Sequence, residues 1–133
     1  MGSALAGLRL LIVEDEAMVA MMIEFMLTDL GCVVVDVAGT VSRGLALAGD
    51  QALALDGAIL DVNLGGEKVY PIAEALRSRH VPFIFSTGYG IDGITEQFAQ
   101  VPALAKPYEQ QTLENMLLTT LVPGASPTRD VAR

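Results

Sequence analysis

The chain has 133 residues, of which 52% are hydrophobic, and this suits one domain with one core. Its 16 acidic residues outnumber its 8 Lys and Arg residues, and the formal net charge of -8 argues against nucleic acid as a partner. The single cysteine, Cys32, excludes an internal disulfide and favours a cytoplasmic location, and no apolar run reaches the ~20 residues of a membrane helix.

Short apolar runs alternate with candidate helices along the chain. The runs predicted to be strands cover residues 8–13, 32–37, 57–62, 81–86 and 102–105. The segments predicted to be helices cover residues 16–30, 41–54, 67–79, 91–99 and 108–121. This alternation predicts an α/β fold, in which helices cover both faces of a doubly wound, five-stranded parallel sheet. We expect one domain over residues 7–121 and a flexible tail over 122–133.

Polar residues stand where the predicted strands end. They are Glu14 and Asp15 after the first strand, Asp61 in the third, Thr87 after the fourth and Lys106 after the fifth. In doubly wound sheets the ligand site lies at the carboxyl ends of the strands. We therefore expect these side chains to converge on one edge of the sheet.

Three carboxylates at one edge restrict the chemistry of such a site. Two like charges ~4 Å apart repel by roughly 4 kcal/mol at an effective dielectric constant of 20, so these acids need nearby cations or protons. An all-oxygen cluster without His or Cys suits Mg2+, which also tends to recruit substrate phosphate. Lys106 could neutralise phosphoryl oxygens and Thr87 could donate a hydrogen bond to them. Asp61 could then act as the nucleophile and form an aspartyl phosphate.

Four blocks of sequence resemble the receiver domain of two-component response regulators over residues 8–121. In chain order these blocks are LLIVEDE, AILDVNL, FSTG and AKPY. The resemblance implies the flavodoxin-like strand order 2-1-3-4-5 and a phosphoacceptor role for Asp61. It also implies that Thr87 and Lys106 contact the phosphate and that the Lys106–Pro107 peptide is cis.

The same resemblance implies a magnesium site. Its expected ligands are Glu14, Asp15, Asp61 and the main-chain carbonyl of Asn63. For Glu14 and Asp15 the alternative is that they only begin the first helix, where acids favour the positive helix end.

The block FSTGYG resembles the Phe-Ala-Thr-Gly-Tyr block of a subgroup of stand-alone receivers from alphaproteobacteria. Many receivers carry an aromatic switch residue three positions before the lysine, where this chain has Ala103. The resemblance therefore implies a switch formed by Thr87, Gly88 and Tyr89, and the alternative for Tyr89 is an ordinary surface tyrosine. We expect phosphorylation to order residues 88–99.

The first predicted helix has more apolar side chains than one core face requires. The stripe predicted to face the core consists of Val19, Met22, Ile23, Met26, Leu27 and Leu30. Met18, Met21 and Phe25 remain on another face, which is typical of a contact surface. Receivers dock the histidine kinase on their first helix, so the resemblance agrees with the spacing. The alternative is a broader buried face.

These inferences predict a single-domain response regulator that accepts phosphate from a sensor histidine kinase or a phosphotransfer protein. It would signal through an unknown downstream protein or a phosphorelay. Because phosphotransfer modifies the protein itself, we do not expect an enzyme with substrate turnover. The alternatives are a receiver fragment of a longer regulator, a non-phosphorylated interaction module and a magnesium-dependent phosphatase. The phosphatase is disfavoured because Asn63 cannot act as the general acid that an Asp would supply there.

Overall fold

Five strands form the central sheet in the order β2-β1-β3-β6-β7, and all neighbouring pairs are parallel. The structure is a computed structural model that describes residues 4–88 and 94–122. Along the chain these are the first to fifth strands of the sheet, so the predicted order 2-1-3-4-5 is confirmed. The strands are β1 (Arg9–Val13), β2 (Val33–Ala38), β3 (Gly57–Asp61), β6 (Phe83–Thr87) and β7 (Ala103–Ala105).

The interior strands have continuous apolar centres because both of their faces are covered. In β1, Leu11 and Val13 contribute to one hydrophobic core, and Leu10 and Ile12 contribute to the other. Successive side chains of a strand point to opposite faces, which explains this division. The continuous apolar run that predicted this strand is therefore the pattern of a sheet buried on both sides.

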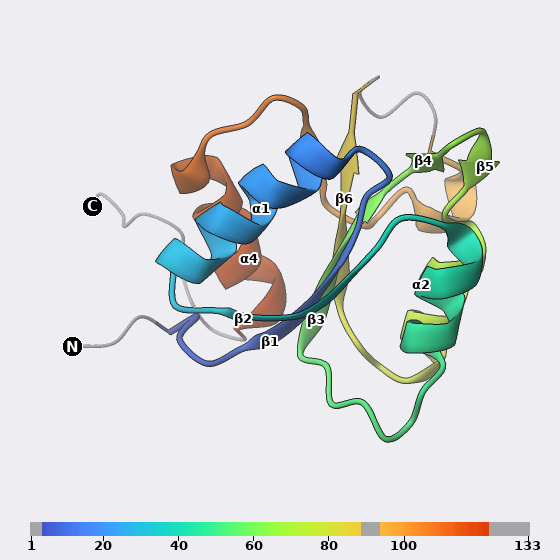
Figure 1. Ribbon diagram of the computed structural model, residues 1–133, viewed down its shortest axis with the longest axis horizontal. Helices are drawn as coiled ribbons and strands as arrows, with labels where there is room; N and C mark the ends of the chain where they lie inside the picture. The colour runs from blue at the N-terminus through green and yellow to red at the C-terminus, as the bar shows by residue number, and fades with distance from the viewer. Residues whose placement is uncertain (1–3, 89–93, 123–133) are drawn as a thin grey trace.

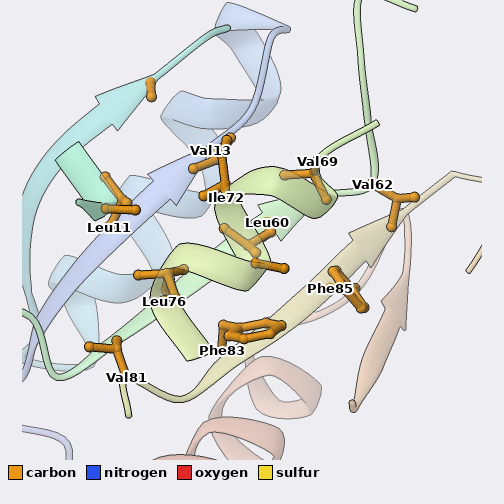
Figure 2. Packing of buried hydrophobic residues seen from close by; sticks show 14 of the residues in the cluster. Leu11, Val13, Leu60, Val62, Val69, Ile72, Leu76, Val81, Phe83 and Phe85 are labelled. Atoms are coloured by element: carbon orange, nitrogen blue, oxygen red, sulfur yellow. The ribbon is translucent and has the colours of Figure 1, made fainter. Parts of the chain in front are cut away.

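Helices cover both faces of the sheet, as the sequence predicted (Figure 1). α1 (Ala17–Asp29) and α4 (Gln110–Leu121) pack on one face, and α2 (Val41–Ala48) and α3 (Tyr70–Ser78) pack on the other. Figure 2 shows the core beneath α3, where Ile72 and Leu76 lie over the sheet. Among the described helices, none combines the length and the apolar character needed to cross a bilayer.

The prediction of a helix over residues 67–79 was wrong at its start. The helix begins at Tyr70, and Glu67–Lys68 instead form a short strand, β5, which pairs antiparallel with β4 (Asn63–Leu64). Gly65 and Gly66 connect the two strands with φ values of 56° and 94°. A two-residue hairpin loop with both central φ values positive favours glycine, and this turn chemistry explains why the helix starts late.

Two other helix predictions were too long. α2 ends at Ala48 rather than at residue 54, and Asp50 accepts a hydrogen bond from the Ala52 N–H at 3.0 Å, which stabilises a turn there. In the predicted helix 91–99, residues 91–93 lie outside the described part of the chain. Its remaining residues contain only the 3-10 turn η2 (Glu96–Phe98).

An aromatic cluster holds this 3-10 turn against α3. The Phe98 ring is buried and stacks on Tyr70 with ring centroids 5.2 Å apart. The Arg77 guanidinium lies 4.4 Å from the centroid of the Phe98 ring, and the Tyr70 hydroxyl accepts a hydrogen bond from the Thr95 N–H at 3.0 Å. These contacts fix the chain ahead of β7.

Candidate functional site

The predicted site residues converge at the carboxyl ends of the strands. A cleft of about 450 Å³ lies there, and Asp15, Asp61, Thr87, Gly88 and Lys106 are among the residues that line it. The pairing of Asp61 with Ser86 in adjacent strands places the acid of β3 beside the end of β6. These side chains therefore meet at the carboxyl edge of the sheet, as the strand pattern predicted.

Glu14 is the most deeply buried acid of this site, with only 2% of its surface exposed. One of its carboxylate oxygens accepts a hydrogen bond from Lys106 Nζ at 2.8 Å, and the other accepts one from the Glu16 N–H at 3.1 Å. Its own N–H donates to the Ala38 carbonyl at 2.9 Å, which fixes the main chain where β1 ends. Burial of this carboxylate is tolerated because it has a cation and a main-chain donor as partners.

Asp61 is also buried, with 6% of its surface exposed, and its oxygens have weaker partners. Lys106 Nζ lies 3.4 Å from Oδ2, and the Asn63 N–H donates to Oδ1 over 3.4 Å. Burial and the nearby charge of Glu14 raise the pKa of Asp61 to about 6, against the opposing effect of Lys106. The site thus carries more negative charge than its lysine balances.

Lys106 holds the two buried acids together. Burial lowers the pKa of its ammonium group, but the hydrogen bond to Glu14 and the charge of Asp61 outweigh this effect and raise the pKa overall. The Lys106 N–H donates to the Thr87 carbonyl at 2.8 Å, and the peptide bond to Pro107 is cis, as expected. The lysine is therefore charged and fixed at the end of β7.

The acidic cluster fits a hard divalent cation. Glu14, Asp15 and Asp61 each offer a carboxylate oxygen, and these atoms all lie within 4.8 Å of one another. Asp15 is exposed and accepts a hydrogen bond from the Gly65 N–H at 3.0 Å, so the β4–β5 hairpin orients it. An all-oxygen set with several carboxylates suits Mg2+. The main-chain carbonyl of Asn63 stays a predicted ligand.

Comparison with known proteins identifies the family. The family model for the response regulator receiver domain matches residues 10–118. The chain belongs to this family. No curated protein sequence matches the chain.

Several solved structures resemble this receiver domain. The solution structure of SdrG from Sphingomonas melonis Fr1 is 44% identical over 86% of this chain and 95% of that chain, with a TM-score of 0.74. The BeF3-activated conformation of SdrG from Pseudomonas melonis Fr1 is 43% identical over 84% of this chain and 94% of that chain, with a TM-score of 0.71.

A third similar structure holds a metal ion. It is the receiver domain of the sensor histidine kinase PA1611 from Pseudomonas aeruginosa PAO1, with magnesium coordinated in its active site cleft. It is 28% identical over 85% of this chain and 96% of that chain, with a TM-score of 0.72.

The predicted switch of this receiver domain is only partly described. Thr87 is buried at the end of β6 and lines the cleft, and a Cβ atom added at Gly88 would meet no atom of the described residues within 4 Å. Packing against residues 4–87 and 94–122 therefore does not require glycine at position 88. Tyr89 lies outside the described residues, together with the rest of 89–93 in the segment expected to become ordered, so this switch stays a prediction.

Sequence reasoning missed a buried aromatic contact beside the site. The Tyr108 hydroxyl lies 3.4 Å from Ser86 Oγ, and burial raises the pKa of this tyrosine. Ser86 is buried, and in the sheet register it lies between Asp61 of β3 and Leu104 of β7. The sequence signal for this contact is the tyrosine two positions after Lys106 in AKPY.

α1 of this receiver domain exposes an apolar surface, as predicted. The exposed fractions are 78% for Met18, 67% for Met21 and 71% for Phe25. Met22 was predicted to face the core, but it is 54% exposed, because the buried face of α1 is formed by Ala20, Ile23 and Leu27. The residues Met18, Met21, Met22, Phe25 and Met26, named the α1 methionine face below, line a shallow groove of about 330 Å³.

Proposed function

We propose that this receiver domain accepts a phosphoryl group on Asp61 and requires Mg2+ to do so. The observation that carries the proposal is the position of the Asp61 carboxylate. It lies 3.4 Å from Lys106 Nζ and within 4.8 Å of the oxygens of Glu14 and Asp15, in a cleft that a donor can reach. A nucleophile beside a cation and an acidic metal site is the arrangement that phosphoryl transfer needs.

The transfer is a displacement at phosphorus. An Asp61 oxygen forms the new bond to phosphorus, while the bond from phosphorus to the imidazole nitrogen of a phosphohistidine breaks. The electron pair of that bond stays on the imidazole nitrogen, which takes up a proton. In the product Lys106 pairs with a phosphoryl oxygen and the Thr87 hydroxyl donates to another. Bound Mg2+, held by Glu14, Asp15 and Asp61, would neutralise charge on the acids and the phosphoryl group.

Beryllofluoride tests this proposal because it mimics a phosphoryl group bound to a carboxylate. We expect bound ¹⁹F resonances for the wild type in the presence of Mg2+ and none for Asp61→Asn under the same conditions. Circular dichroism of both proteins checks that the variant keeps its fold. Equal binding by the variant, or no binding by a folded wild type with Mg2+, would contradict the proposal.

We also infer that the donor is a sensor histidine kinase or a phosphotransfer protein that docks on the α1 methionine face. Met18, Met21 and Phe25 are its most exposed members, and adaptable methionine side chains suit a protein contact. The face lies on the helix that directly follows Glu14 and Asp15, so a partner seated there would stand near the cleft. Output would follow through contact with a downstream protein or through a phosphorelay. Similarity to SdrG along nearly its whole solved chain supports a single-domain regulator.

Met21→Glu tests the docking surface. With a histidine kinase that phosphorylates the wild type, we expect the variant to accept phosphate at least tenfold more slowly, because a charge would be buried in an apolar contact. Phosphorylation by acetyl phosphate, which needs no docking, should not change. Thr28→Glu adds the same charge to an exposed position of α1 outside the groove and serves as the control. Unchanged transfer to Met21→Glu would contradict docking at this face.

A further inference from the structure

Lys68 lies at the rim of the cleft that contains Asp61. It belongs to β5, and the hairpin register places it directly opposite Asn63, two residues after Asp61. Its side chain lines the same cleft as Asp61, Thr87 and Lys106. Figure 1 shows the β4–β5 hairpin following β3 at the end of the sheet where β6 also ends.

The hairpin holds Lys68 in a defined place. Leu64 of β4 is buried, and the Val69 N–H donates to the Val62 carbonyl at 3.0 Å, which closes the hairpin at its base. At its tip the Gly65 N–H donates to Asp15, an acid of the cleft. The hairpin is therefore bound both to the core and to the acidic cluster, and Lys68 is not a side chain on a loose loop.

The two lysines of the sequence both line this cleft, but they differ in how they are engaged. Lys106 pairs with Glu14 at 2.8 Å and with Asp61 at 3.4 Å, and its side chain is largely buried. Lys68 is exposed, and within residues 4–88 and 94–122 the structure shows no ion pair for it. Its ammonium group is thus free to bind an incoming anion.

An anionic donor would otherwise meet an unfavourable field. The chain carries a net charge of -8, and Asp15 and Glu16 both line the cleft in exposed positions. Exposed charges act over a Debye length of about 8–10 Å at physiological salt, which covers the width of such a cleft. A cation at the rim offsets this repulsion where the donor must pass.

We propose that Lys68 is a donor-binding residue that holds the anionic oxygens of the phosphoryl group as it enters the cleft. It thereby favours donors that carry a net charge of minus two over donors in which a protonated leaving group reduces the net charge to minus one. This inference rests on the proposed phosphorylation of Asp61.

Two small donors of different charge test the proposal. Acetyl phosphate, a dianion at neutral pH, transfers its phosphoryl group to Asp61 with cleavage of its P–O bond and release of acetate. Phosphoramidate, which carries one net negative charge, transfers it with cleavage of the P–N bond and release of ammonia. The second-order rate of phosphorylation is measured with each donor and Mg2+ by intact mass, at low and at high ionic strength.

We expect Lys68→Gln to react about three- to tenfold more slowly than the wild type with acetyl phosphate at low salt. The loss should be smaller with phosphoramidate and should shrink at high salt. Lys68→Arg keeps the charge and should restore most of the rate. Arg43→Gln removes one positive charge from an exposed residue that does not line the cleft, so it should react like the wild type.

The possible outcomes separate this inference from the function on which it rests. Equal rates for Lys68→Gln and the wild type, with normal phosphorylation of Asp61, would overturn the role of Lys68 alone. An equal loss with both donors at every salt concentration would also overturn it, because that pattern indicates a structural defect. If the wild type accepts no phosphate from either donor, the proposed function itself fails.

Discussion

At the scale of single residues, the site is a cluster of charges that do not balance. Asp61 and Glu14 are buried together and share one ammonium group, that of Lys106. Neighbouring carboxylates repel unless a cation or a proton joins them, and the pKa of Asp61 is raised by its burial and, secondly, by this repulsion from Glu14. The charged Asp61 carboxylate therefore lowers the free energy of unfolding of the metal-free protein at neutral pH.

Asp61→Asn should stabilise the metal-free protein at neutral pH. The pKa of Asp61 is about 6 in the folded chain against an ordinary value of 3.8, so the protonated form stabilises the fold at low pH. That stability is fully present below pH 3.8 and is lost as the pH rises through about 6. The variant has no such group, so its advantage in unfolding free energy should grow to about 1–2 kcal/mol by pH 7.5.

Thermal unfolding of both proteins between pH 4 and pH 7.5 checks this prediction. Addition of Mg2+ at pH 7.5 should raise the Tm of the wild type and reduce the gap, because the ion binds the folded acids. The electrostatic account would be contradicted if the difference in Tm between Asp61→Asn and the wild type did not vary with pH. It would also be contradicted if Mg2+ raised the Tm of both proteins equally.

At the scale of secondary-structure elements, α2 and α3 pack closely because α2 contains a glycine at the contact. A Cβ atom added at Gly44 would lie 2.5 Å from Ile72 Cδ1 and 3.3 Å from Ile72 Cγ1. Ile72 is fully buried in the core shown in Figure 2, so its side chain has little room to move away. Packing against Ile72 thus explains the glycine inside this helix.

Gly44→Ala should lower the free energy of unfolding by about 1–2 kcal/mol, because overpacking outweighs the better helix propensity of alanine. Denaturation in urea measures the change. Gly39→Ala is the matched control, since its nearest contact would be the Glu14 carbonyl oxygen at 3.8 Å, and it should stay within about 0.5 kcal/mol of the wild type.

A second substitution makes this test independent of helix propensity. Ile72→Val removes the Cδ1 atom that the new Cβ would meet, so the double variant should lose less stability than the two single variants together. Strictly additive losses would show that the contact between Gly44 and Ile72 does not limit the packing of α2.

The elements that sequence predicted well are those in which periodicity and burial agree. All five strands of the sheet were found, because strands buried on both faces are continuous apolar runs. The β4–β5 hairpin was missed because it is held by turn glycines and by Asp15, which periodicity does not detect. Met22 was misplaced because its spacing fits two adjoining faces of α1, and in the structure the buried face is the one that carries Ala20, Ile23 and Leu27.

At the scale of the whole molecule, the topology brings the site residues together. Glu14 and Lys106 are 92 positions apart in the chain, yet they form the shortest ion pair of the site, at 2.8 Å. The convergence was predictable, because parallel strands place their carboxyl ends at one edge. The sequence does not predict which acid pairs with Lys106, because that choice depends on side-chain burial and on the main-chain donors at each strand end.

The molecule also separates its surfaces by chemistry. The cleft is lined by acids and two lysines, whereas the α1 methionine face next to it is apolar. A partner protein could therefore be held by apolar contacts while the phosphoryl group meets the charged cleft. This division supports a receiver in which docking and phosphate chemistry can be altered by separate substitutions.

The most direct test of the central claim is the intact mass of the protein after incubation with Mg2+ and acetyl phosphate. We predict a mass increase of one phosphoryl group for the wild type, lost when the metal is chelated and absent from Asp61→Asn. An adduct of equal yield on Asp61→Asn, or no adduct on a folded wild type that binds Mg2+, would contradict the assignment of Asp61 as the phosphoacceptor.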